Sequence, residues 1–277
     1  MNADLHCHST VSDGWLLPGD VVRRAARNGV EVLALTDHDE VSGLDEAQAA
    51  AEAESLHLVN GVEISVSFLG ETVHIVGLGI DYHDPALLAG LAQVRGGRDE
   101  RARRMSEALA EVGIRGALEG ARRFARNPEL VSRAHFARHL VSTGLMPDVN
   151  TVFRHYLTKG KPGFVEHVWA SLDEAVGWIR GAGGIAVVAH PARYRFSNAE
   201  LEQLFDRFVA CGGEGVEVVS GAHSDDDVAR FATLARRRGL LASRASDFHG
   251  EHESPVDLGR CASLPPDLAP VWASLLR

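Results

Sequence analysis

The sequence predicts an α/β protein whose strands form a closed or nearly closed barrel, interrupted by a helical insertion. Three observations lead to this prediction. Short apolar runs alternate with amphipathic helical patterns at both ends of the 277-residue chain, which is typical of parallel strands joined by right-handed helical crossovers. About seven such runs can be recognised, which favours a barrel over an open sheet. Histidines and carboxylates cluster at these runs, as expected where a barrel collects its chemistry at one end.

The first part of the chain supplies the first four strands. Residues 30–35 are apolar apart from Glu31, as in a strand that is buried on both faces, and they lead into Thr36-Asp37-His38-Asp39. The apolar stripe of residues 18–28 ends at Asn28-Gly29, a common helix stop. We expect helices at 18–28 and 42–54 and strands at 3–6, 30–35, 57–67 and 72–80.

The middle of the chain reads as helical from about residue 84 to residue 156. We therefore expect a barrel domain formed by residues 1–82 and 157–277, and a helical, substrate-capping insertion domain formed by residues 83–156. Between Arg95 and Arg138 the chain contains eleven arginines, no lysine and six acidic residues. Most of these arginines fit a solvated helical face. The alternative is a basic lid over a phosphorylated ligand.

The alternation of strands and helices resumes after the turn-rich segment 159–163. Ser171 and Glu174 form a capping-box pattern at a helix start. Residues 225–238 begin with acidic and end with basic residues, as the helix dipole favours. We expect helices at 171–182, 198–210 and 225–238 and strands at 184–189, 215–219 and 240–245.

Composition excludes several classes of protein. The net charge of −10 argues against a protein that coats DNA or RNA. No apolar run approaches the roughly 18 residues that a membrane span requires, and the first residues lack the pattern of a secretory signal. Cys7, Cys211 and Cys261 are too scattered to suggest disulfides or a zinc ribbon. We expect a cytoplasmic protein without a membrane partner.

The chemistry-bearing residues begin with His6-Cys7-His8. Side chains alternate along a strand, so His6 and His8 point to one face and can reach the same metal ion, while Cys7 faces the core. A single histidine near an apolar strand is more often an ordinary core residue. Paired residues of ligand type are harder to explain in that way. The candidate metal ligands are His6, His8, Asp13, His38, Glu63, His74, His190, Asp247 and His249.

This set is large enough for more than one ion. A catalytic zinc ion needs only three protein ligands, so we expect two or three divalent metal ions in the chain. Mixed histidine and carboxylate ligands suit manganese, zinc or iron better than calcium or magnesium alone. His223, which follows the strand expected at 215–219, could face the site or be an ordinary residue.

The order and spacing of these motifs resemble the PHP (polymerase and histidinol phosphatase) family. They run from residue 5 to residue 249 and span nearly the whole chain apart from the insertion. The resemblance implies a distorted (β/α)7 barrel with a trinuclear metal site and phosphoesterase activity. It also implies three ligand sets: His6, His8, Glu63 and Asp247 for one ion; Glu63, His74 and His190 for a second; and Asp13, His38 and His249 for a third.

Two segments of the insertion narrow the expected activity. Residues 132–138 and 156–162 resemble stand-alone PHP proteins that act as 3′,5′-nucleoside bisphosphate phosphatases or as 5′-3′ exoribonucleases. We expect removal of the 3′-phosphate of a nucleoside 3′,5′-bisphosphate, such as adenosine 3′,5′-bisphosphate, by direct attack of a metal-bridging hydroxide, with manganese as the ion. A 5′-3′ exoribonuclease acting on short RNA, a histidinol phosphatase and, least favoured, a non-catalytic PHP module are the alternatives.

The second phosphate of such a substrate needs a cationic site. The guanidinium fork of arginine suits phosphate; an ordinary surface cation is the alternative for each residue. Trp169, Tyr194 or Phe196 could stack on the base, although core packing is the favoured use. The candidates for binding the phosphate are Ser132, Arg133, His135 and Arg193, with Lys159 and Lys161 as second choices.

Overall fold

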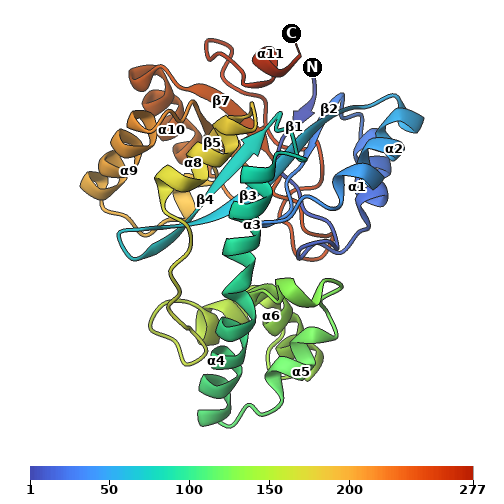
Figure 1. Ribbon diagram of the computed structural model, residues 1–277, viewed down its shortest axis with the longest axis vertical. Coiled ribbons are helices and arrows are strands. Elements are labelled where there is room, and N and C mark those ends of the chain that lie inside the picture. The colour runs from blue at the N-terminus through green and yellow to red at the C-terminus, as the bar shows by residue number, and fades with distance from the viewer. Residues whose placement is uncertain (277) are drawn as a thin grey trace.

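The computed structural model describes residues 1–276 and contains one seven-stranded sheet in the order β1 to β7. Cys7, just after β1, pairs in parallel with Phe248, just after β7, so the first and last strands meet in a nearly closed barrel (Figure 1). The expected α/β barrel is confirmed. Its strands are β1 (Ala3–Asp4), β2 (Val32–Leu35), β3 (His57–Phe68), β4 (Glu71–Leu78), β5 (Ile185–Val188), β6 (Gly215–Ser220) and β7 (Leu241–Ala245).

Strand β4 runs against the expected direction. It pairs antiparallel with β3 and with β5, whereas the other neighbouring strands pair in parallel. Leu69 and Gly70 connect β3 to β4 with φ of 48° and 75°, as in a two-residue hairpin turn. A parallel crossover needs about a dozen residues. β4 therefore departs from the parallel arrangement of the βα units, and this hairpin distorts the barrel.

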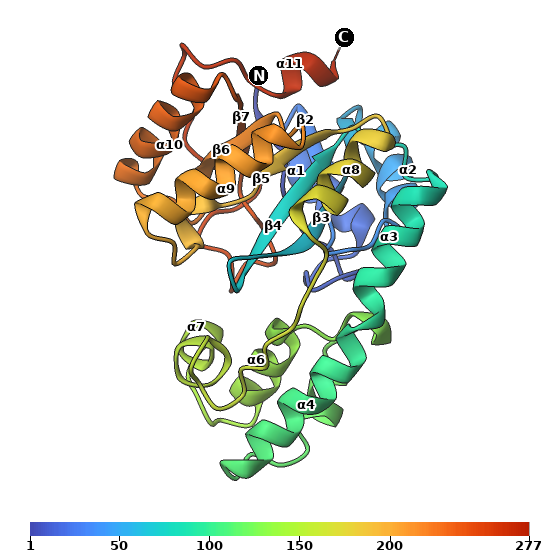
Figure 2. The same cartoon turned by 60° about the vertical axis from the view of Figure 1, so that its left-hand side comes forward.

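Helices cover the outside of the barrel (Figures 1 and 2). Pro18 lies in the first turn of α1, where its missing N–H costs nothing. The capping box expected at Ser171 and Glu174 is present at the start of α8. These helices are α1 (Pro18–Arg27), α2 (Leu44–Glu54), α8 (Leu172–Gly181), α9 (Asn198–Ala210) and α10 (Asp225–Arg238).

Alternate strand residues build two apolar layers. On β2, Val32 and Ala34 belong to the cluster inside the barrel, while Leu33 and Leu35 join the larger cluster shared with the helices. Trp272 of α11 (Trp272–Leu275) packs against the inner cluster. The N-terminus and α11 lie at this end of the barrel, away from the insertion (Figure 1). Within residues 1–276, no helix combines the length and hydropathy needed to cross a membrane.

The insertion forms a helical lobe below the barrel (Figure 2). We call α4 to η2 the helical lobe; it has an apolar core of its own, which includes Met105, Phe136 and Leu157. Helix α3 links the two parts, because its Leu87 packs into the barrel core. The domain boundaries at 83 and 156 stay a prediction. The elements are α3 (Pro85–Gly96), α4 (Arg98–Glu111), α5 (Ala117–Arg122), η1 (Pro128–Leu130), α6 (Arg133–Ser142), α7 (Val149–Val152) and the π-helical η2 (Phe153–Leu157).

Candidate active site

All nine expected metal ligands converge at the barrel end that faces the helical lobe. His38 follows the end of β2 by three residues, and His190 and Asp247 follow β5 and β7 by two. Glu63 lies in β3, beyond the residues that pair with β2. Because β4 is antiparallel, His74 near its beginning lies at the same end and pairs with Ser65 of β3. The hairpin that the sequence analysis did not anticipate thus brings His74 to the site.

Glu63 stands at the centre of this cluster and is fully buried. Its Oε1 lies 2.8 Å from His74 Nδ1 and 3.0 Å from His190 Nε2. Its Oε2 lies 2.8 Å from His38 Nδ1 and 3.3 Å from Nε2 of both His6 and His8. A carboxylate with ligand-type nitrogens around both oxygens has the arrangement of a bridging ligand.

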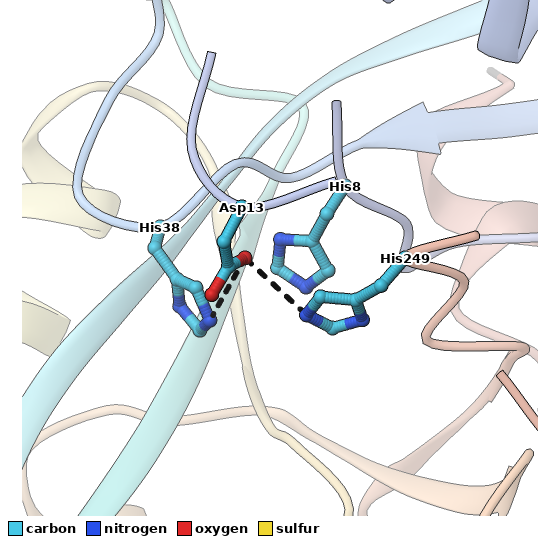
Figure 3. A group of neighbouring side chains, drawn as sticks. All are labelled: His8, Asp13, His38 and His249. Carbon is cyan, nitrogen blue, oxygen red and sulfur yellow. Dashed lines mark ion pairs between the residues drawn. The ribbon is translucent and has the colours of Figure 1, made fainter. Parts of the chain in front are cut away.

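Asp13 gathers a second group of side chains. Figure 3 shows His8, His38 and His249 around its carboxylate. Asp13 Oδ1 lies 3.3 Å from His249 Nε2 and 3.8 Å from His38 Nε2. The ligand atoms of these four residues all lie within 4.8 Å of one another, as do those of His6, His8 and Asp247. His8 therefore lies between two groups, whereas the sequence assigned it to one.

The side chains of this cluster are arranged as ligands of a metal ion rather than as hydrogen-bond partners of one another. Asp13 Oδ1, His38 Nδ1, Glu63 Oε2 and His74 Nδ1 are buried and, within the described chain, make no hydrogen bond, although their neighbours lie at contact distance. Buried polar atoms are normally satisfied. Lone pairs that converge without hydrogen-bond geometry are what a metal site requires. The residues present therefore fit divalent metal ions.

The protonation states of His8, His74 and Glu63 agree with this assignment. Burial lowers the pKa of His8 to about 3 and that of His74 to about 4, so both rings are neutral and can donate a lone pair. Burial alone would raise the pKa of Glu63, but the charge of His38 holds it well below its usual range. The central carboxylate is therefore ionised.

Glu217 on β6 supports two of the histidines, and the sequence analysis did not identify it. Its Oε1 lies 2.6 Å from His6 Nδ1, and its Oε2 accepts a hydrogen bond from the main-chain N–H of His190 over 2.6 Å. His190 has φ of 27°, a strained value for a residue with a side chain. Glu217 orients the first ring and holds the backbone at the second. Only its position, inside an apolar strand, could have drawn attention to it.

A cavity of about 680 Å³ separates this cluster from the helical lobe. The barrel contributes His38, Glu63, His74 and Arg193 to its wall, among other residues. A neighbouring cavity of about 420 Å³ shares part of this wall and extends towards Lys159. From the lobe, the wall of the larger cavity includes Arg98, Arg101, Ser132, Arg133, Ala134, Val149, Asn150 and Phe153.

Two arginines of this wall lack a carboxylate partner. Arg98 pairs with Asp39, but in the part of the chain that the structure describes no acid lies within ion-pair distance of Arg101 or Arg133. Arg101 is only 6% exposed and its Nε makes no hydrogen bond. Burial, followed by the charges of Arg133 and Arg98, lowers its pKa well below the usual value. Buried cations normally have a partner, so this pair is suited to an anion entering the cavity.

Two other predicted residues also line the larger cavity. Ser132 Oγ donates a hydrogen bond to Asp13 Oδ2 over 3.0 Å. Arg193 Nη1 lies 2.6 Å from Asp247 Oδ2, so its guanidinium lies beside the ligand cluster. Arg193 was expected, with Arg133, to bind the second phosphate, and its contact with Asp247 places it beside the expected metal ligands.

Several predicted residues lie elsewhere. His135 is buried and does not line the cavity; its Nδ1 accepts the Ser132 N–H in the capping box of α6, which corrects its assignment to the substrate. His223 also lies outside the cavity wall, with its ring stacked on Phe231. Lys159 is bonded to the β3–β4 turn at Gly70 and lines the smaller cavity.

Packing, the favoured use of the three aromatic residues, is what their contacts show. Trp169 is buried, and the guanidinium groups of Arg98 and Arg101 lie 4.8 and 5.2 Å from its ring centre. The Tyr194 hydroxyl donates to the Ala189 carbonyl over 2.8 Å and accepts from the His74 N–H over 2.9 Å. Tyr194 and Phe196 also pack against the barrel core, in keeping with the packing role that the sequence favoured.

Comparison with known proteins identifies the family. The model of the PHP domain matches residues 4–185. A 3′,5′-nucleoside bisphosphate phosphatase of Chromobacterium violaceum is 55% identical over 274 residues, which cover 99% of this chain and 96% of that protein. A 5′-3′ exoribonuclease of Haemophilus influenzae is 40% identical over 269 residues, or 97% of each chain. The structure of an amidohydrolase from Chromobacterium violaceum, with bound sulfate and no metal, has a TM-score of 0.97 at 54% identity and covers 100% of this chain and 96% of that one. The chain belongs to the PHP domain family.

Proposed function

We propose that the chain is a metal-dependent phosphoesterase that hydrolyses the 3′-phosphate of nucleoside 3′,5′-bisphosphates, with adenosine 3′,5′-bisphosphate as a representative substrate. One observation carries this proposal: Arg101 and Arg133, which have no acidic partner among residues 1–276, line the same cavity as the metal-ligand cluster. One small molecule with two phosphates could occupy both places. The similarity to a nucleoside bisphosphate phosphatase supports the same substrate class.

The cluster would hold the metal ions of this enzyme. Two or three divalent ions, with manganese expected and zinc or iron as alternatives, would when bound activate a water molecule and offset the charge of the phosphate. Glu63 would bridge, since both of its oxygens face ligand-type nitrogens. The proposed ligands remain His6, His8, Asp13, His38, Glu63, His74, His190, Asp247 and His249.

The other residues of the cavity bind and orient the substrate. Arg193, beside Asp247, is placed to neutralise oxygens of the 3′-phosphate. Arg101 and Arg133 bind the 5′-phosphate, and Phe153 and Val149 offer an apolar wall to the nucleoside. In the reaction the oxygen of water bonds to phosphorus, the bond from phosphorus to the 3′ oxygen breaks, and that oxygen leaves with a proton. The products are a 5′-nucleotide and phosphate.

A 5′-3′ exoribonuclease is the second candidate function. The smaller cavity of about 420 Å³ shares Arg101 and Arg133 with the larger one and is lined by Lys159, so it could accept a further nucleotide of a short RNA. The 40% identity to a 5′-3′ exoribonuclease is consistent with this use. The physiological partner is in either case a nucleotide or a short RNA; a cytoplasmic location stays a prediction from the sequence.

The remaining alternatives fit the cavity less well. Histidinol phosphate has one phosphate and would leave the buried Arg101 without an anion. A non-catalytic PHP module would have no use for a complete set of nine ligand-type side chains gathered around one cavity.

A substrate comparison tests the proposal. Phosphate release is measured with added Mn²⁺ for adenosine 3′,5′-bisphosphate, adenosine 3′-monophosphate, histidinol phosphate and a 5′-phosphorylated short RNA. We expect the highest kcat/KM for the bisphosphate, mainly through a lower KM than that of the 3′-monophosphate. Equal kcat/KM for these two nucleotides, or a preference for histidinol phosphate, would contradict the proposal.

A further inference from the structure

Helix α6 of the lobe touches one metal-ligand residue of the barrel from two positions. At its N-cap, Ser132 Oγ donates to the Asp13 carboxylate at Oδ2. Farther along the helix, Arg138 Nη2 donates to the main-chain carbonyl oxygen of Asp13. The lobe therefore holds both the side chain and the backbone of this residue.

Arg138 is itself held firmly against the barrel. It is only 4% exposed, and its Nε and Nη2 donate to the two carboxylate oxygens of Glu253 over 2.7 and 2.8 Å. Its guanidinium lies 4.6 Å from the ring centre of Trp15, whose Nε1 donates to the same carboxylate over 2.8 Å. Arg138, Trp15 and Glu253 thus form one contact between the lobe and the barrel. A buried, paired guanidinium of this kind fixes geometry better than a flexible surface ion pair.

Asp13 needs such support more than the other ligands do. It lies in a turn between β1 and α1, nine residues beyond the last residue of β1, whereas His6, Glu63 and Asp247 lie in strands or within two residues of one. The sheet therefore does not set its position. Ser132 occupies Oδ2, which leaves Oδ1, without a hydrogen bond, directed towards His38 and His249.

We infer that Ser132 and Arg138 are positioning residues that complete the metal position formed by His8, Asp13, His38 and His249. Docking of the helical lobe and binding of one metal ion are then coupled: the docked lobe places Asp13, and an ion bound to Asp13 favours the docked lobe, since coupling between two binding equilibria is reciprocal. This inference rests on the proposed metal centre. It extends that proposal by making a ligand position of the barrel depend on a second part of the chain.

The substitution Arg138→Met tests this inference, because it keeps an apolar side chain against Trp15 and removes the donors to Asp13 and Glu253. Arg122→Met is the matched control, since Arg122 is an exposed arginine of the same lobe that is paired with exposed Asp99. Metal stoichiometry and affinity are measured for Mn²⁺ by elemental analysis and calorimetry. We expect one equivalent per chain to bind at least about tenfold more weakly in Arg138→Met, with the other equivalents and the control unchanged. Activity should return as Mn²⁺ is raised.

The possible results distinguish failure of the coupling from failure of the proposed metal centre. Native stoichiometry and affinity in a folded Arg138→Met protein would overturn the coupling and leave the metal centre intact. A native protein that binds none of manganese, zinc or iron would remove the metal centre and the coupling together. Should Arg138→Met not fold, as judged by circular dichroism, Ser132→Ala removes the contact to the Asp13 carboxylate, and the same loss of one equivalent is expected.

Discussion

The Glu217 carboxylate lies 2.6 Å from His6 Nδ1. With Nδ1 engaged, the Nε2 lone pair of His6 faces His8, Glu63 and Asp247. The same carboxylate holds the main chain of His190, so one residue on β6 aligns ligands that follow two other strands. It is 1% exposed, which keeps water from competing for these bonds.

Replacing Glu217 with Gln should weaken metal binding. The amide keeps the shape of the side chain but places an N–H₂ group against either the His6 ring or the His190 N–H. We expect a loss of metal affinity of about 10–100-fold, the usual effect of losing a residue that orients a ligand. Calorimetric titration of Mn²⁺ measures it. Glu214→Gln, on an exposed side chain just before β6, is the control; native affinity in Glu217→Gln would show that the contact has no role in metal binding.

Substitution of Arg101 by Met should reveal the binding site of the second phosphate. A hydrogen bond to a charged group contributes about 1.5–3 kcal/mol, so KM for adenosine 3′,5′-bisphosphate should rise about tenfold or more. Adenosine 3′-monophosphate, which has no 5′-phosphate, should be hydrolysed as by the native enzyme. Arg104→Met, at an exposed position of the same helix, is the control. An equal rise in KM for both nucleotides would mean that Arg101 does not bind the 5′-phosphate.

Metal affinity should rise with pH between about 7 and 9. Burial disfavours the charged form of His38, but the charges of Glu63 and Asp13 outweigh burial and raise its pKa to about 9 in the metal-free protein. A metal ion must displace this proton. Below the pKa the proton competes with the metal, so the apparent Kd for Mn²⁺ should fall as the pH increases and should level off above about 9. Calorimetry in buffers of different ionisation enthalpy counts the released protons; a Kd independent of pH, with no proton release, would contradict this.

The cap of α8 offers a test of stability that is separate from activity. Ser171 Oγ accepts the Glu174 N–H over 3.3 Å, at an exposed helix end. Ser171→Ala should lower the free energy of unfolding by about 1 kcal/mol and leave kcat and KM unchanged. Ser171→Asp, which retains an acceptor, should remain near native stability. Urea unfolding followed by circular dichroism distinguishes the two; equal stability of the Ala variant would show that this cap is unimportant.

Much of the barrel could be predicted from local patterns. The apolar run at 30–35 and the caps at Ser171 and Gly239 mark elements whose signals lie within a few residues. The direction of β4 could also have been inferred, because only four residues separate the strands expected at 57–67 and 72–80. That gap is too short for a crossover.

The metal ligands could be predicted where they lie close together in sequence motifs. His6 and His8 lie two residues apart just after a strand and reach one ligand group, whereas Asp247 and His249, also two residues apart, reach two groups that share His8. The environment of Arg101 was not predictable, because its lack of an acidic partner depends on how the helical lobe packs.

His135 is the opposite case, because the sequence singled it out but its role in the structure is local. Its motif drew attention, but its ring completes a helix cap, a role that depends on local backbone geometry rather than on residue type. Glu217 was missed because its two partners are separated from it by 211 and 27 residues.

The central claim is that the metals act on the 3′-phosphate while the lobe holds the 5′-phosphate. The most direct test is to identify the nucleotide left after adenosine 3′,5′-bisphosphate is treated with the manganese-loaded protein, by chromatography and phosphorus NMR. The account predicts adenosine 5′-monophosphate and one equivalent of phosphate. Adenosine 3′-monophosphate as the product would place the substrate in the opposite orientation and contradict the account.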